Sequence, residues 1–127
     1  MNSKFLKCEH CGLVVHQFGD DNKELTCCGT KLKELMPNSM EASVEKHVPV
    51  VKVEGNKLTV QVGVVEHIQT EQHYIDWIYV KCGTRTQGVV LSAKDKPCVE
   101  FYGEWKGKVE VQASCNLHGI WLSTILC

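Results

Sequence analysis

The sequence lacks the marks of several large protein classes. None of its 127 residues forms part of an apolar run near the ~20 residues that a membrane-spanning helix needs. The N-terminal segment MNSKFLKCEH has no apolar core followed by a small-residue cleavage site, so we expect no signal peptide and a cytoplasmic location. A formal charge of -1, with scattered basic residues, argues against the broad basic face of a nucleic-acid-binding protein.

Cysteine, by contrast, is abundant. The sequence has eight cysteines: Cys8, Cys11, Cys27, Cys28, Cys82, Cys98, Cys115 and Cys127. In a reducing compartment such residues are more often metal ligands, reactive thiols or core residues than disulfide partners. A secreted disulfide framework is the alternative, and the missing signal and the adjacent Cys27–Cys28 pair both count against it.

A change of composition along the chain predicts two modules. Residues 1–36 hold four cysteines and few large apolar residues, and segments below ~40 residues usually need a metal or disulfides to fold. The stretch MPNSMEAS, residues 36–43, breaks any regular pattern. We therefore expect a metal-stabilised module at 1–36, a linker at 37–44 and a larger domain at 45–127.

The larger domain shows the period-2 alternation of β-strands. VPVVKVEGNKLTVQVGVV, residues 48–65, predicts a hairpin that turns at residues 54–57. Further strands are expected at 73–82, 86–92, 98–102, 108–115 and 120–126. Short strands at this spacing, without a convincing amphipathic helix, predict an all-β chain with an antiparallel β-sandwich of about seven strands.

Four thiols occur as two tight pairs, in CEHCG (residues 8–12) and CCG (residues 27–29). The glycine after each pair lets the backbone turn closely around a metal and direct N–H groups at the sulfurs. Tetrahedral coordination by Cys8, Cys11, Cys27 and Cys28 suits zinc or a single iron. Spacing alone favours a structural zinc site, but zinc ribbons generally leave two residues between paired cysteines. The adjacent pair indicates a more specific, distorted site.

A second candidate site combines Cys115 and His118, in CNLHG, with His47, His67 and His73. Each histidine lies at the edge of a predicted strand, where the loops of a sandwich can converge. Imidazoles with one thiolate suit iron or copper. Blue copper sites commonly carry an axial methionine beyond their C-terminal ligands, and here no methionine follows His118. Copper is therefore the weaker choice.

Four motifs, in this order, resemble the desulfoferrodoxin family, the two-iron superoxide reductases. CEHCG…CCG is similar to the desulforedoxin-type module of that family. EKHVPV, the H-x5-H pair that ends in HYIDWI, and CNLHG are similar to its catalytic module. The resemblance covers essentially the whole chain and implies an immunoglobulin-like sandwich, in agreement with the strand pattern. One departure is that Glu66 and Ile68 flank His67, where members often have prolines.

The resemblance implies two iron (Fe) ions per chain. Cys8, Cys11, Cys27 and Cys28 would hold a rubredoxin-like iron with four thiolate ligands, which would serve as an electron relay or reservoir. The second iron would have four histidine ligands and one cysteine ligand. There, Cys115 would be the axial thiolate and the equatorial ligands would be His47, His67, His73 and His118. This second centre would reduce superoxide to hydrogen peroxide by one electron, without releasing dioxygen.

Glu45 and Lys46 precede the first of these histidines. By itself, an adjacent Glu-Lys pair is ordinary solvated surface. The resemblance implies that Lys46 attracts superoxide and organises proton delivery, and that Glu45 occupies the open position of the oxidised iron. It also implies a homodimer and a rubredoxin-like electron donor.

Two other functions compete with this one. A superoxide dismutase would also oxidise superoxide and release dioxygen. A non-enzymatic iron electron carrier, or another metal-binding module, would have a filled and closed histidine site. Cys82, Cys98 and Cys127 match no ligand of the family, and we interpret them as packing or surface residues. We interpret His10 and His16 in the same way, because a single histidine is more often a core or surface residue than a ligand.

Overall fold

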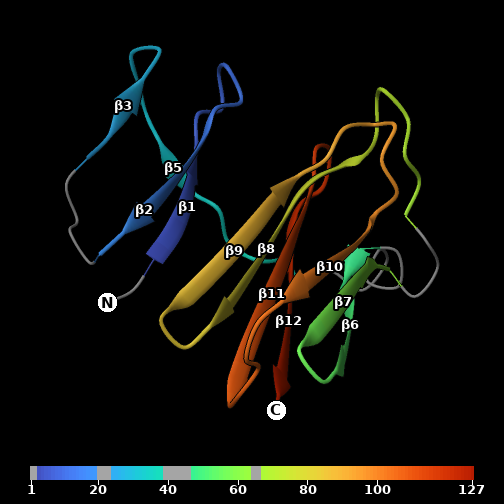
Figure 1. Cartoon of the computed structure of the whole chain (residues 1–127). Helices are drawn as coiled ribbons and strands as arrows, with labels where there is room; N and C mark the ends of the chain where they lie inside the picture. Colours follow the sequence, from blue (N-terminus) through green and yellow to red (C-terminus); the bar gives the residue numbers. More distant parts are fainter. Residues whose placement is uncertain (1–2, 20–23, 39–46, 64–66) are drawn as a thin grey trace. The chain divides into compact units, whose positions relative to one another are not determined.

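The computed structural model describes residues 3–19, 24–38, 47–63 and 67–127, which contain twelve β-strands (Figure 1). The predicted all-β class is confirmed. The chain divides into two compact units, Met1–Met36 and Pro37–Cys127. Within the described ranges, no helix is long and apolar enough to cross a membrane.

The first unit has five short strands: β1 (Ser3–Lys7), β2 (Val14–Phe18), β3 (Thr26–Cys27), β4 (Thr30–Lys31) and β5 (Lys33–Glu34). β1 is the centre of the antiparallel sheet β2-β1-β5, and β3 and β4 form a separate hairpin. Its buried cluster consists of Leu6, Cys8 and Leu32. Burial of a leucine contributes about 1.5–3 kcal/mol, whereas ordering costs roughly 1–2 kcal/mol for each residue. Apolar burial alone therefore does not explain why this unit folds.

The second unit has seven strands: β6 (Pro49–Glu54), β7 (Lys57–Val62), β8 (Ile75–Cys82), β9 (Arg85–Val90), β10 (Cys98–Tyr102), β11 (Lys108–Cys115) and β12 (Gly119–Leu126). They form two antiparallel sheets, β10-β7-β6 and β12-β11-β8-β9. The predicted hairpin is present, with Glu54 paired to Lys57 across the turn. The seven-stranded sandwich expected from the sequence is confirmed.

Alternating apolar residues form the core between these two sheets. In β7 the burial alternates along the strand, with Leu58, Val60 and Val62 fully buried. Val109 and Val111 of β11 are equally buried and belong to the same cluster. This alternation is the physical basis of the sequence pattern, since successive strand residues point to opposite faces of a sheet.

The end of β11 is irregular. Ser114 pairs with Trp77 of β8, but Cys115 pairs with Ile75, so Asp76 is an extra residue on the β8 side. Such bulges bend a strand and re-aim its side chains. On the other edge, Cys115 pairs with Gly119 of β12, which leaves a three-residue loop, 116–118, between the strands. The bulge and the loop together place Cys115 and His118 at one end of the sandwich.

Candidate metal centres

The first unit brings its four predicted cysteines together. One sulfur from each of Cys8, Cys11, Cys27 and Cys28 lies within 4.8 Å of every other. The Cys11 and Cys27 sulfurs are 3.6 Å apart, and those of Cys27 and Cys28 are 3.7 Å apart. Cys8 is buried, while Cys11 and Cys28 are exposed. The site is therefore anchored in the small core and open on one side.

Tight backbone turns position both cysteine pairs. The Gly12 N–H donates to the Cys8 carbonyl at 2.8 Å, and Gly12 has a φ of 81°. In the second pair, Cys27 faces Thr30 across a two-residue hairpin loop whose members, Cys28 and Gly29, have φ values of 54° and 74°. Two positive φ values in such a loop are typical of a type I′ turn. This turn is how two adjacent cysteines reach one site.

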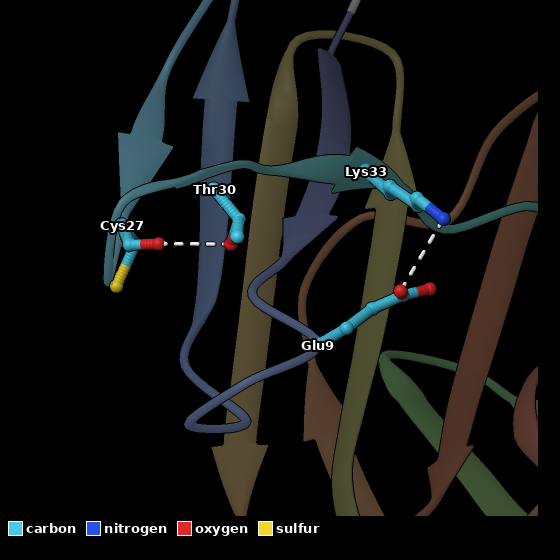
Figure 2. A network of polar contacts seen from close by, with 4 residues as sticks. All are labelled: Glu9, Cys27, Thr30 and Lys33. Carbon is cyan, nitrogen blue, oxygen red and sulfur yellow. Dashed lines mark hydrogen bonds and ion pairs between the residues drawn. The ribbon is translucent and has the colours of Figure 1, made fainter.

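Figure 2 shows two polar links around this hairpin. Thr30 lies on the strand that follows the turn, and its hydroxyl donates to the Cys27 carbonyl at 3.1 Å. Lys33 Nζ lies 3.3 Å from a carboxylate oxygen of Glu9, which joins β5 to the loop between Cys8 and Cys11. Both charged side chains are exposed, so this ion pair contributes at most about 1 kcal/mol. The chemistry of the site therefore depends on its four thiols and not on this ion pair.

The thiols perturb one another's ionisation. The backbone N–H of Cys11 is the main reason that the pKa of Cys8 falls to about 6. Hydrogen bonding with Cys11 is the main cause that raises the pKa of Cys27 to about 12. One thiolate is therefore well stabilised, but further negative charge in so small a volume is not. A bound cation removes this conflict, and the donor set fits a metal that prefers thiolates.

In the second unit, four imidazole rings form a closed square. Neighbouring ring centroids are 4.7 Å apart for His47–His67, 4.6 Å for His67–His73, 4.9 Å for His73–His118 and 4.8 Å for His118–His47. The diagonal from His47 to His73 is 6.2 Å. Each neighbouring pair meets edge to face, at 68° to 83°. The rings come from three separate segments of the chain.

Two ring nitrogens in this square have lone pairs that can bind a metal ion. His67 Nδ1 lies 2.6 Å from the Ile68 carbonyl and can donate to it, which leaves Nε2 as the lone-pair nitrogen. Nε2 of His67 and of His73 is buried, with no hydrogen-bond partner in the described part of the chain. Burial lowers the pKa of His67 to about 4 and also lowers the pKa of His73. Neutral imidazoles with unused lone pairs fit a metal ion.

Cys115 lies beside the square. It is buried, and its sulfur is 3.5 Å from Nδ1 of His118, which is 3.0 Å from Nε2 of His47. Atoms of Cys115, His47, His67 and His73 lie within 4.8 Å of one another. Burial raises the pKa of the Cys115 thiol, against the backbone N–H groups of Leu117 and His118, which lower it.

The sequence of this chain is similar to those of known proteins. The desulfoferrodoxin family model matches residues 39–124. A desulfoferrodoxin homolog from Archaeoglobus fulgidus is 41% identical over an alignment of 120 residues, and the match covers 92% of this chain and 93% of that protein. The chain belongs to the desulfoferrodoxin family. Its group of four cysteines, and its group of three histidines with Cys115, match the two iron sites of desulfoferrodoxin.

Solved structures agree with membership of the desulfoferrodoxin family. The superoxide reductase from Treponema pallidum has a TM-score of 0.79 and 28% identity, and the match covers 96% of this chain and 97% of that one. The one-iron superoxide reductase from Giardia intestinalis has a TM-score of 0.59 and 30% identity. That match covers 65% of this chain and 99% of the Giardia chain.

Glu45, Lys46 and most of the predicted linker lie outside the described residues. Asn38, also assigned to the linker, donates its backbone N–H to the Ile120 carbonyl at 2.8 Å and its side-chain N–H to the His118 carbonyl. Asn38 thus belongs structurally to the second unit of this desulfoferrodoxin-family chain. The sequence did not predict this contact between Asn38 and the hairpin of β11 and β12.

The remaining candidate residues belong to neither cluster of metal-binding groups that the described ranges contain. Cys98 and Cys127 are exposed, and the Cys82 thiol donates to the Lys106 carbonyl at 3.3 Å. The His16 ring stacks on Phe5 and is tilted by 47° from Phe18, with ring centroids 4.3 Å apart in both pairs, and His10 is exposed. Their surroundings in the described part of the chain assign these residues no role in the desulfoferrodoxin sites.

Gly119, the first residue of β12, is expected to lose more stability on substitution by alanine than a glycine with open surroundings. Its φ is 83°, and an added Cβ would lie 2.8 Å from the Asn38 amide nitrogen that binds the His118 carbonyl. Gly107 has a φ of 74° but no atom within 4 Å of such a Cβ, so Gly107→Ala measures the backbone cost alone. We expect Gly107→Ala to lower the free energy of unfolding by about 1 kcal/mol. Gly119→Ala should cost about 1 kcal/mol more, for the disturbed hydrogen bond.

Denaturant titration followed by tryptophan fluorescence would measure both values, because all three tryptophans lie in the second unit. Equal losses for the two variants would contradict the proposed role of the Asn38 contact.

Proposed function

We propose that this protein is a superoxide reductase, which adds one electron and two protons to superoxide to give hydrogen peroxide, without releasing dioxygen. The observation that carries the proposal is the closed square of four imidazole rings with the Cys115 sulfur beside it. In this proposal, a ferrous iron would be held by imidazole nitrogens of His47, His67, His73 and His118 and by the thiolate of Cys115. When bound there, iron supplies the electron.

The charge of this ligand set supports the proposal. The environment of His67 and His73 favours the uncharged imidazole, so these side chains add no charge of their own. With one thiolate, a ferrous site then has a net charge near +1, and it does not repel the anionic substrate. Burial raises the pKa of the Cys115 thiol, so its thiolate form would depend on the bound cation, and the charge would then lie inside the protein.

The known relatives support the same activity and its place in the chain. The Treponema and Giardia structures are both superoxide reductases by name. The Giardia protein is a one-iron enzyme and aligns over nearly all of its own length with two thirds of this chain. A one-iron superoxide reductase has a single centre at which to carry out the reaction. We therefore propose that the reaction takes place at one centre of this chain, the second one.

The first centre is then proposed to be an electron relay or reservoir. Its four sulfurs offer a thiolate-only donor set, and Cys11 and Cys28 are exposed, so an external donor could reach it. A rubredoxin-like donor and a homodimer complete the proposal by similarity to the family.

Lys46→Ala is expected to slow the reaction with superoxide. Lys46 immediately precedes His47 in the sequence, and a positive charge next to the site would raise the rate of encounter with an anion. We expect the second-order rate constant to fall by about tenfold and its dependence on ionic strength to weaken. Pulse radiolysis over a series of salt concentrations would measure both quantities.

Lys52→Ala is the matched control, because Lys52 is exposed and paired with Glu54 on β6. If Lys46→Ala and Lys52→Ala kept the same rate and the same salt dependence as the unsubstituted protein, steering by Lys46 would be ruled out.

Product stoichiometry tests the function itself. The anaerobically reduced protein is mixed with a known amount of superoxide, and peroxide and dioxygen are quantified. About one peroxide for each superoxide consumed, without protein-dependent dioxygen, is the expected result. Half that peroxide with matching dioxygen would mean dismutation. A rate no faster than the spontaneous reaction would mean an electron carrier.

A further inference from the structure

Asn116 lies in the loop between two proposed ligands, Cys115 and His118, and reaches across to the segment that carries a third. Its side-chain oxygen accepts a hydrogen bond from the Tyr74 N–H at 2.9 Å. Its side-chain nitrogen donates to the Gln72 carbonyl at 3.1 Å. Tyr74 and Gln72 are the two sequence neighbours of His73, so the side-chain amide of Asn116 is hydrogen-bonded to the backbone on both sides of that histidine.

Only a carboxamide meets both demands. One atom of the side chain must accept from an N–H and the other must donate to a carbonyl, which neither a carboxylate nor an alkyl group can do. The backbone adds a third link, since the Asn116 N–H donates to the Tyr74 carbonyl at 3.1 Å. The segment of His73 is therefore tied to the loop of Cys115 and His118 by three hydrogen bonds.

The opposite side of the His73 segment has an anchor of its own. Gln69 accepts a hydrogen bond from the Ile75 N–H at 2.8 Å and donates to the Asp95 carbonyl at 3.0 Å. Asn116 is thus the side-chain link between this segment and the β11–β12 hairpin. The rings that it holds in place, those of His73 and His118, have centroids 4.9 Å apart.

We propose that Asn116 is a positioning residue, which fixes the spacing between His73 and the Cys115–His118 hairpin and so sets the affinity of the second centre for its metal. The proposal rests on the ligand set given under the proposed function. Asn116 is assigned no contact with metal or substrate. Its effect passes through the three ligands that its hydrogen bonds hold at a fixed separation.

Cobalt(II) binding to the full-length, metal-free protein tests this role without an activity assay. The absorption bands of cobalt at the two centres differ, because one donor set is all thiolate and the other is mostly imidazole. The four-cysteine centre serves as an internal reference in every titration. Three variants are compared with the unsubstituted protein: Asn116→Ala, Asn116→Asp and Gln87→Ala.

Asn116→Ala should raise the Kd for cobalt at the second centre by about tenfold or more, as loss of an outer-shell partner typically does, and should shift its thiolate-to-cobalt band. Asn116→Asp keeps an acceptor for the Tyr74 N–H and loses the donor to Gln72, so its Kd should be intermediate. Gln87→Ala removes a comparable bond, from the Gln87 amide to the Tyr102 carbonyl at 3.0 Å, and should change neither Kd nor band.

Cobalt binding by Asn116→Ala with the original affinity and band would overturn the proposal. If Asn116→Ala does not fold, as judged by tryptophan fluorescence, Asn116→Asp decides between the same two results. Failure of this proposal can be distinguished from failure of the proposed activity: a protein that reduces no superoxide, but whose cobalt affinity falls in Asn116→Ala, would keep the positioning role and lose the activity.

Discussion

Cys115→Ser is expected to abolish most of the superoxide reduction, with a rate constant lowered by roughly 100-fold or more. Loss of an outer-shell partner alone typically costs about 10–100-fold, and Cys115 is proposed as a direct ligand. Serine is close in size, so the buried position at the end of β11 should still pack. Its hydroxyl, however, offers a hard and weakly acidic oxygen in place of a soft thiolate.

Absorption spectroscopy separates the loss of this ligand from a general loss of iron. The sulfur-to-iron band of the second centre should vanish, while the bands of the four-cysteine centre should persist in the same sample. Cys98→Ser is the matched control, because Cys98 is an exposed strand cysteine outside both clusters. A Cys115→Ser protein with an unaltered rate and spectrum would remove Cys115 from the ligand set.

The strands could be predicted from the sequence because their signals are local. Alternation in β6, β7 and β11 reports burial on one face, and this pattern depends only on residues within each strand. The glycines after the cysteine pairs were expected to supply tight turns, and Gly12 and Gly29 do have positive φ values. The bulge at Asp76 gave no such signal, because a bulge is set by the pairing partner.

The arrangement of the site could be predicted only in part. Clustering of the four histidines was expected from their positions at strand edges, and the structure does bring their rings together. Their roles as iron ligands stay a prediction. The packing around them left no trace in the sequence: the Trp121 ring stacks on His47 at 4.9 Å, and this contact exists only because β12 and the segment before β6 meet in the fold.

The type I′ turn at Cys28 shows why local rules also miss features of function. A two-residue hairpin is usually predicted from Asn-Gly or Asp-Gly, and a cysteine in the left-handed region is disfavoured by roughly 1–2 kcal/mol. Here the first turn residue is Cys28, whose φ is 54°. The strained position places a fourth sulfur within reach of the others, so a binding requirement outweighs the backbone preference.

Cys8→Ser is expected to unfold the first unit and to leave the second one folded. Cys8 is fully buried and is one of three residues in the buried cluster of the first unit, the others being Leu6 and Leu32. Metal binding can contribute about 10–16 kcal/mol to the folding of such small modules, far more than two leucines supply. Without that contribution, the entropy cost of ordering the unit is not offset.

Hydrogen–deuterium exchange of the full chain resolves the two units separately. Amides of β1 and β2 should lose their protection in Cys8→Ser, whereas those of β8 and β11, which border the core of the sandwich, should keep it. Tryptophan fluorescence should stay unchanged, because every tryptophan lies in the second unit. Cys98→Ser, which touches neither metal group, should change no amide of the first unit. Protection of β1 and β2 that survives in Cys8→Ser would show that apolar packing alone folds this unit, and its metal would then serve electron transfer without being needed for the fold.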